Sequence, residues 1–385
     1  MRKTINIGDL GTIITGKTPP TTNKNYYGDY AVFIKPTDIS EHSKYTYETE
    51  EMYSKLAAEK YESSLIPKGA ICVPCIGTIG TKMTMAPCDC YTNQSINSIV
   101  CNDRYDNEYV YYLIKNFLPG LKSYNLGTAS GREYVSKSNF EKIELVAEQD
   151  KTIQKKIGEF LSRYDSLIEN YQKQIKLLEE AAQRLYKEWF VDLRFPGHEN
   201  TNIIDGVPEG WEKKSVDSIY NIKYGKNLST KLITETGFYP VYGANGVIGY
   251  YDKANCNEQV VLITSRGNGS GDVLMTYHKD AFITNNSFIV TPSEGFEYCK
   301  LPFTFQFLKM ANFRAVRTGA AQPQLTNQSI HTVDVILPNK NLIEKFCSAT
   351  IEMNDTIIKY REQIRLLTEA RDRLLPKLMS GEITI

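Results

Sequence analysis

One amphipathic helical pattern occurs twice in this chain and restricts its fold more than any other feature. The copies align without a gap from Tyr171 and from Tyr360, and apolar positions recur in both at alternating steps of four and three. A period of 3.5 residues over several heptads is typical of a coiled-coil seam. The seam of the first copy is Ile157, Leu161, Tyr164, Ile168, Tyr171, Ile175, Leu178, Ala182, Leu185 and Trp189, and that of the second is Phe346, Thr350, Met353, Ile357, Tyr360, Ile364, Leu367, Arg371, Leu374 and Leu378.

The two helices are expected to pair with each other in antiparallel orientation. Each is about 40 residues, or roughly 60 Å, long. Antiparallel pairing lets the intervening segment form a compact body at one end, while the C-terminus returns to the first domain. Arg371, which replaces Ala182 in the alignment, suits an open end or a partner contact better than a dry core. The alternative is two ordinary amphipathic helices in separate cores.

The globular segments repeat more loosely, which predicts an approximate two-fold axis. Residues 7–17 resemble 216–226, and 135–146 resemble 325–337. Residues 70–80 resemble 260–271, with Gly77 matched to Gly267, and 91–100 resemble 282–290, with 93–95 matched to 285–287. These runs are short and β-rich, with helices expected around 50–61, 105–118 and 298–311. The predicted class is α+β, with a first domain at 1–147, a helix at 148–190, a second domain at 191–338 and a helix at 339–385.

Composition and charge exclude several classes of protein. The 45 Lys+Arg balance the 45 Asp+Glu, so net charge gives no sign of nucleic-acid binding. An apolar run long enough to span a membrane is missing, as is the apolar core of a signal peptide, so the expected location is cytoplasmic. Cys72-x2-Cys75 and Cys88-x-Cys90 resemble a zinc site, but the second domain has no matching cysteines. A metal in the first domain alone stays open.

Catalytic motifs are missing from the chain. The glycine-rich run 266–271 fits neither a P-loop nor a dinucleotide fingerprint. The four histidines have neither metal-ligand nor triad spacing. The acidic pairs Glu50-Glu51 and Glu179-Glu180 are expected to be ordinary solvated surface. The sequence therefore predicts a binding protein and not a catalyst.

Several short motifs resemble the specificity subunits of type I restriction-modification systems over essentially the whole chain. They are Glu188–Gly197 after the first helix, Pro208–Trp211 and Tyr239–Gly246 in the second domain, and Leu374–Ile383 in the last helix. The resemblance implies two target recognition domains, each recognising half of a split double-stranded DNA site. It also implies helices that set the spacing and bind two modification subunits, which hold S-adenosylmethionine and methylate adenine, while restriction subunits that hydrolyse ATP join for cleavage.

Exposed loops rich in Lys, Arg, Asn, Gln, Ser and Tyr are the predicted DNA contacts, because such side chains bind phosphates and base edges. In the first domain they are Lys17, Thr18, Lys35, Thr37, Thr78, Lys82, Ser130 and Arg132. In the second they are Lys223, Tyr224, Lys226, Tyr242, Asn245, Ser265, Arg266, Asn268, Ser270, Arg317, Gln322 and Gln324. Arg266 and Arg132 are expected to contact guanine, and Gln322, Gln324 or Asn245 adenine.

Two other functions fit the same architecture. One is a stand-alone DNA-binding regulator, and the other is a coiled-coil scaffold that joins two protein-binding domains. Co-purification with an adenine methyltransferase would distinguish a specificity subunit from both of these alternatives.

Overall fold

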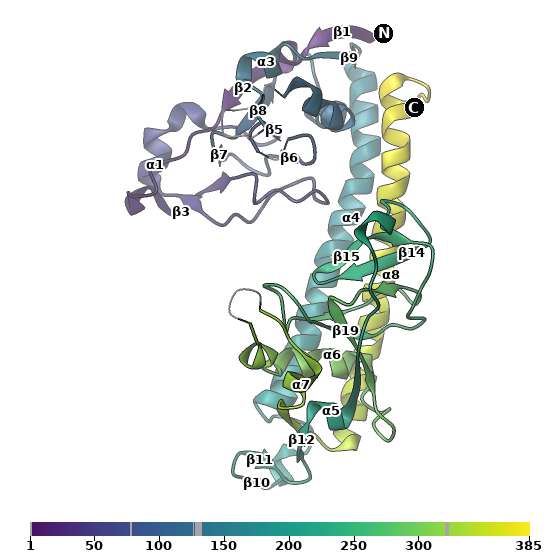
Figure 1. The fold of residues 1–385 in the computed structure, drawn as a ribbon. Coiled ribbons are helices and arrows are strands. Elements are labelled where there is room, and N and C mark those ends of the chain that lie inside the picture. Colours follow the sequence, from purple (N-terminus) through teal and green to yellow (C-terminus); the bar gives the residue numbers. More distant parts are fainter. Residues whose placement is uncertain (1, 78, 126, 128–132, 320–322) are drawn as a thin grey trace. The chain divides into compact units, whose positions relative to one another are not determined.

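The computed structural model describes the chain except residues 1, 78, 126, 128–132 and 320–322, and it divides into two compact units. One unit contains residues 1–171 and 363–385, and the other residues 172–362. Two long helices, α4 (Lys151–Tyr186) and α8 (Lys340–Ser380), contribute a segment to each unit (Figure 1). A short π-helical turn, Lys187–Val191, extends α4. The returning C-terminal segment thus belongs to the first unit, as the sequence predicts.

The helices pair in antiparallel orientation, which the second unit shows directly. Arg361 of α8 lies 3.0 Å from Glu179 of α4, whereas the earlier Phe346 packs against the later Tyr186, with 5.7 Å between ring centroids. The residue numbers on α8 decrease while those of their partners on α4 increase, so the two helices run in opposite directions. Every seam position named above is buried or half-buried. The predicted coiled coil and its register are confirmed.

Arg371 is the seam residue for which the expectation is wrong. It is 6% exposed and forms ion pairs with Asp165 of α4 and with Asp372. Asp165 also accepts a hydrogen bond from the hydroxyl of Tyr112. Burial lowers the pKa of Arg371, but the two carboxylates outweigh this and raise it, so the guanidinium stays charged. A paired arginine can occupy a closed seam because its charge is compensated there.

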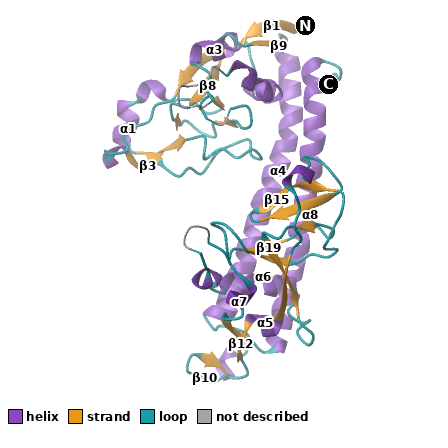
Figure 2. Cartoon of the chain, in the orientation of Figure 1, coloured by secondary structure: helices purple, strands orange, loops and turns teal. Residues whose placement is uncertain are grey.

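The first domain combines short strands and helices (Figure 2). Its strands form a four-stranded and a three-stranded sheet. The four-stranded sheet has the order β2 (Gly11–Thr15), β8 (Ile96–Cys101), β5 (Ile71–Pro74), β6 (Thr84–Met85). The three-stranded sheet has the order β4 (Met52–Tyr53), β3 (Tyr27–Ile34), β7 (Tyr91–Thr92). The other elements are β1 (Arg2–Asn6) paired with β9 (Glu144–Glu148), and the helices α1 (Lys55–Lys60), α2 (Asn107–Phe117) and α3 (Lys137–Glu141).

The second domain repeats this arrangement. Its four-stranded sheet has the order β13 (Tyr220–Tyr224), β19 (Ser287–Pro292), β16 (Val261–Thr264), β17 (Val273–Met275). Its three-stranded sheet has the order β15 (Gly246–Tyr251), β14 (Tyr239–Gly243), β18 (Phe282–Ile283). β12 (Glu212–Ser215) pairs with β20 (Asp334–Leu337), β10 (Ile203–Ile204) with β11 (Val207–Pro208), and the helices are α5 (Val216–Ile219), α6 (Leu301–Met310) and α7 (Asn327–Ile330).

Side-chain caps start several of the short helices where the sequence places Ser, Thr or Asp. Ser54 accepts from the amide of Ala57 at α1, and Asp106 accepts from the amide of Tyr109 at α2. Thr326 and Ser329 form a reciprocal capping box at α7. Each cap satisfies an amide that has no partner within the helix. The helices predicted around 50–61, 105–118 and 298–311 are present as α1, α2 and α6.

The hydrogen bonds of the two domains correct one internal alignment by one residue. Lys17 donates its amide to the carbonyl of Thr92, whereas Lys226 donates to Ile283. Thr92 therefore corresponds to Ile283, so the predicted match of 93–95 with 285–287 is shifted by one position. The two segments are turns that connect equivalent strands, and their similar composition hides the shift.

Close approach explains a glycine that both domains share. A Cβ at Gly16 would collide with the backbone carbonyls of Thr92 and Asn93, and one at Gly225 with those of Ile283 and Thr284. Both glycines therefore lie at equivalent crossings, where the chain passes from the four-stranded to the three-stranded sheet of its domain. Lys17 and Lys226, which follow the glycines, are both exposed there.

Each domain shares a hydrophobic core with its helix segments. In the first unit Ile157 and Leu161 of α4 and Leu378 of α8 lie in one cluster with Tyr109 of α2. The guanidinium of Arg2 donates to the carbonyls of Leu378 and Met379, each at 3.0 Å, and so caps the end of α8. In the second unit the corresponding cluster contains Tyr186, Phe303 and Phe346 among others. The domains are therefore built onto the helices within each unit.

Candidate nucleic-acid interface

A backbone bridge brings two candidate base contacts of the second domain side by side. Arg266 and Gln324 are antiparallel bridge partners, and both side chains are exposed. The bridge is held by the amide of Gly267 on the carbonyl of Pro323 at 3.0 Å and by that of Leu325 on Ser265 at 2.7 Å. A guanidinium and a side-chain amide can each form paired hydrogen bonds to a base edge. Residues far apart in sequence thus form one surface.

Asn245 and Asn268 extend this surface. Asn245 lies in the turn between β14 and β15, and its Oδ1 is 3.2 Å from the place of a Cβ at Gly269. The turn therefore lies directly against the loop that carries Arg266 and Asn268. Both asparagine side chains are exposed. We call Asn245, Arg266, Asn268 and Gln324 the recognition edge.

Arg317 lies beside the recognition edge. Its neighbour Thr318 exchanges backbone hydrogen bonds with Gln324, at 2.8 and 2.9 Å. The side chain of Arg317 is half-buried, and its Nε and Nη2 have no hydrogen-bond partner among the residues that the structure describes. Unsatisfied buried donors cost free energy, which an incoming acceptor such as a phosphate or a base would recover. Arg314, by contrast, is bound to Asp272 at 2.6 Å.

The strand β13 and the loop after it carry the other predicted contacts of this domain. Lys223, Tyr224 and Lys226 are all exposed. The ring of Tyr224 packs on Phe288 with centroids 4.2 Å apart, which fixes its orientation while 42% of the residue stays accessible. An exposed ring and two cations are the groups that bind nucleic-acid backbones and bases.

In the first domain Lys17 and Thr18 occupy the loop that follows Gly16. Both are exposed; Lys17 donates to the hydroxyl of Ser63 at 3.1 Å, and Thr18 hydrogen-bonds to Gln94. Thr37 is exposed and Lys82 is half-buried. Thr78, Ser130 and Arg132 of this domain, and Gln322 of the second, lie outside the described residues.

Lys35 is less available than the sequence suggests. Its ammonium binds Glu50 at 2.7 Å and Glu51 at 3.2 Å, and 18% of its side chain is exposed. Burial lowers its pKa, but the hydrogen bonds to Glu50 and Glu51 outweigh this and raise it. The acidic pair expected to be plain solvated surface thus neutralises Lys35, and we assign this lysine a structural role.

Three predicted contacts of the second domain are buried. Tyr242 is 3% exposed, and Ser265 and Ser270 are fully buried. The hydroxyls of Ser265 and Ser270 donate to backbone carbonyls, at 3.1 and 3.4 Å. Such side chains cannot meet DNA in this arrangement, and they organise the loops from inside. Polar residues in a β-rich loop segment are hard to distinguish from exposed ones by sequence pattern alone.

The cysteine cluster does not converge on one point. Cys72 packs in a core with Cys90, whereas Cys75, which leaves the same strand on its opposite face, packs in another core. Burial raises the pKa of Cys72 and of Cys75 to about 12. Within the described residues, His, Cys, Asp and Glu form no cluster that could hold a metal. Cys72, Cys75 and Cys90 belong to the hydrophobic interior, whereas Cys88 is exposed.

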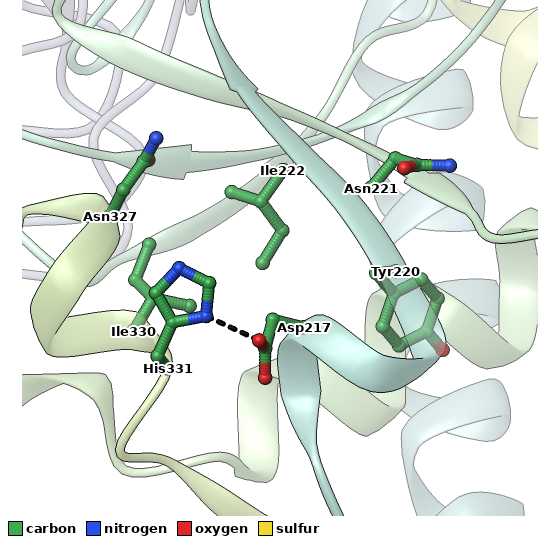
Figure 3. A pocket seen from close by; sticks show the side chains of 7 residues that line it. All are labelled: Asp217, Tyr220, Asn221, Ile222, Asn327, Ile330 and His331. Carbon is green, nitrogen blue, oxygen red and sulfur yellow. Dashed lines mark hydrogen bonds and ion pairs between the residues drawn. The ribbon is translucent and has the colours of Figure 1, made fainter.

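A pocket of about 190 Å³ lies between α5, β13 and α7 (Figure 3). Its lining includes Asp217 and His331, which are bonded to each other, and the exposed Asn221 and Asn327. Burial raises the pKa of Asp217, but hydrogen bonds from Ser215 and His331 outweigh this and lower it. The pair connects α5 to the end of α7. We therefore infer that it supports the loop that precedes α7.

The structure also identifies residues that the sequence did not single out. In the first domain Ile76 and Tyr134 are bridge partners, with hydrogen bonds that match those around Arg266 and Gln324. Tyr134, half-buried, therefore takes the place of Gln324. The internal alignment contains this signal, because it matches Gly77 to Gly267 and 135–146 to 325–337.

Within the described residues, none of the helices is long and apolar enough to cross a membrane. Comparison with known structures supports the fold. A type I restriction-modification S subunit from M. genitalium matches with a TM-score of 0.58 at 19% identity, covering 98% of this chain and 96% of that one.

Sequence comparison gives the family. The MjaIX specificity subunit of Methanocaldococcus jannaschii is 27% identical over 407 residues, covering 98% of this chain and 93% of that protein. The HindI specificity subunit of Haemophilus influenzae is 37% identical over 158 residues, covering 39% of this chain and 33% of that protein. The family described as the type I restriction modification DNA specificity domain matches residues 2–180 and 208–365. Since the match covers most of both halves of the repeat, the chain belongs to this family.

Proposed function

We propose that this chain is the DNA-recognition subunit of a type I restriction-modification complex. Each domain recognises one half of a bipartite DNA site, and the paired helices set the distance between the halves. The observation that carries the proposal is the recognition edge, where Asn245, Arg266, Asn268 and Gln324 gather from three separate loops. Exposed amides and a guanidinium on one surface match the donor and acceptor pattern of a major groove.

The difference between the two domains supports separate half-sites. Their sheets have the same order, and both place an exposed lysine after a glycine at the same crossing. At the bridge, however, one domain has Arg266 and Gln324 and the other has Ile76 and Tyr134. A shared frame with different side chains at equivalent places is suited to recognising two different sequences.

Two modification subunits are the proposed partners of the helices. Large apolar side chains stay exposed on the helix segments of each unit: Leu167 (46%) and Leu366 (44%) in the first, Leu177 (64%) and Ile351 (37%) in the second. Exposed apolar residues on a helix that already has a buried seam suit a second helical partner. Those subunits would hold S-adenosylmethionine and methylate adenine, and restriction subunits would join for cleavage. The chain itself would carry no catalytic group and no cofactor.

A pair of substitutions in the assembled methyltransferase tests the proposal. Arg266→Ala removes a base contact, so discrimination at one base pair should fall by about 1–3 kcal/mol while other positions keep theirs. Lys226→Ala removes a phosphate contact, so affinity should fall for all sequences and the slope of log K against log salt should flatten by about one unit. Lys213→Ala, which removes an exposed cation on β12, is the matched control. Base preferences that are identical in the wild type and Arg266→Ala would show that Arg266 makes no base contact and does not belong to the recognition edge.

A further inference from the structure

A chain of side-chain contacts connects the helix pair of the second unit to its recognition edge. It begins at Arg361 on α8, whose Nη2 donates to Glu179 of α4 at 3.0 Å and to the hydroxyl of Tyr277 at 3.1 Å. The guanidinium also stacks on the ring of Tyr277, 3.7 Å from its centroid. One arginine therefore joins both helices to the segment after β17. Planar stacking together with directed hydrogen bonds fixes a ring more tightly than a point charge would.

The next contact passes from Tyr277 to Tyr242. The backbone amide of Tyr277 donates to the hydroxyl of Tyr242 at 3.0 Å, and that hydroxyl also lies 2.9 Å from Nδ1 of His278. Tyr242 is 3% exposed and belongs to β14. A buried hydroxyl with two partners has a fixed position, because loss of either partner leaves a polar group unsatisfied.

The last contacts bind the end of β14 to the recognition edge. The hydroxyl of Thr264 donates to the carbonyl of Ala244 at 2.7 Å, and that of Ser287 donates to the carbonyl of Gly243 at 3.2 Å. Asn245 is the next residue after Ala244, and Arg266 is two residues after Thr264. Asn245 and Arg266, two of the four residues of the recognition edge, are therefore attached to the segment that Tyr242 holds.

We infer that Arg361 is a positioning residue for DNA recognition by the second domain, acting through Tyr277 and Tyr242. It fixes the recognition edge relative to the helix segments of its own unit, so the edge meets the bases in a defined place. The inference rests on the proposed function and adds a residue that lies on a helix, outside the recognition edge. Tyr242, predicted to touch DNA, acts from inside the protein.

The internal repeat predicts that this device acts on one half-site. The residue that matches Arg361 in the first helical copy is Gln172, which offers neither a charge nor a guanidinium plane. Substitution of Arg361 should therefore reduce sequence discrimination in the half-site of the second domain and leave the other half-site unchanged. A contact that served only the stability of the chain would not separate the two halves in this way.

The experiment uses the assembled methyltransferase and compares initial methylation rates on the cognate site and on sites with one base pair changed in either half. Arg361→Gln and Tyr277→Phe should lower discrimination in the second half-site about two- to tenfold, the value of one hydrogen bond. Arg361→Lys keeps the charge for Glu179 but loses the stacked plane, so it should restore part of the loss. Arg373→Gln, which changes an arginine of α8 that is 78% exposed, is the control and should have no effect.

The outcomes separate the inference from the proposed function. Unchanged discrimination in both halves, or an equal loss in both, would overturn the inference while a wild-type complex with a bipartite preference keeps the proposed function. A wild-type complex with no sequence preference would overturn both. Thermal unfolding of each variant accompanies the rates, and Tyr277→Phe, which keeps the ring for Arg361, provides the result if Arg361→Gln fails to fold.

Discussion

The guanidinium of Arg371 on α8 is bound to the carboxylate of Asp165 on α4, and each side chain is only 7% exposed. The hydroxyl of Tyr112, from α2 of the first domain, donates to the same carboxylate. One buried ion pair therefore joins the two helices of the first unit to the domain that packs on them. The internal alignment places Ala182 and Asn354 at the corresponding positions, so the repeat does not duplicate the pair.

Removal of one partner of this pair should destabilise the first unit strongly. Arg371→Met leaves the Asp165 carboxylate buried without its cation, which costs about 3–5 kcal/mol. Chemical denaturation of the purified chain measures the loss, and Arg373→Met, at an exposed position of the same helix, should change stability by less than about 1 kcal/mol. The triple variant Tyr112→Phe/Asp165→Leu/Arg371→Met, which also removes the hydroxyl that would lose its acceptor, should recover much of the loss. A triple variant as unstable as Arg371→Met would contradict this account.

Alanine at the shared glycines should destabilise both domains. The Cβ of Gly16→Ala or Gly225→Ala would collide with backbone carbonyl oxygens, which cannot move aside as a flexible side chain can. Overpacking of this kind costs typically about 1–3 kcal/mol. Thr12→Ala, at an exposed position on β2, is the control. Unfolding curves for both glycine variants that match the wild type would show that the crossing is looser than described.

Thiol reactivity should follow burial and not a metal site. Cys88 is exposed, whereas burial raises the pKa of Cys72 and Cys75 to about 12. Because the thiolate is the reactive form, a pH rise from about 7.5 to 9.5 should speed alkylation of Cys88 and leave the other two protected. Mass spectrometry after a short iodoacetamide pulse measures this. Protection of Cys88 by added zinc would contradict the assignment.

Lys35 and Lys17 should differ as DNA contacts. Lys35 is already bound to Glu50 and Glu51, so Lys35→Ala should change the affinity of the assembled complex for DNA little. Lys17→Ala removes an exposed cation and should weaken binding to all sequences, with a lower salt slope. Titrations at several salt concentrations compare the two variants. A larger effect of Lys35→Ala would place Lys35 on the DNA.

Features that depend on local pattern could be predicted from the sequence. The coiled-coil seam, the paired domains and their helices follow from hydrophobic periodicity, and the structure has them in the predicted register. The bridge between Arg266 and Gln324 was within reach for the same reason, because both segments recur in the first domain. Periodicity identifies a face of an element, and a repeat identifies which elements are equivalent.

Features that depend on distant partners could not be predicted. Arg371 looked unsuited to a closed seam because its partner Asp165 is far away in sequence. Tyr242 looked like a loop contact because only the fold shows that Tyr277 and His278 cover its hydroxyl. Lys35 looked free because its acidic neighbours approach only when the chain folds back. In each case the role of a polar side chain depends on burial and on a partner that pattern does not reveal.

The central claim is that this chain directs methylation to a two-part DNA site. Base-resolution mapping of methylated adenine in cells with the gene, without it, and with Arg266→Ala tests this most directly. The account predicts a motif of two short specific halves with a fixed gap, absent without the gene and relaxed in one half only by Arg266→Ala. A methylation pattern that is unchanged when the gene is deleted would contradict it.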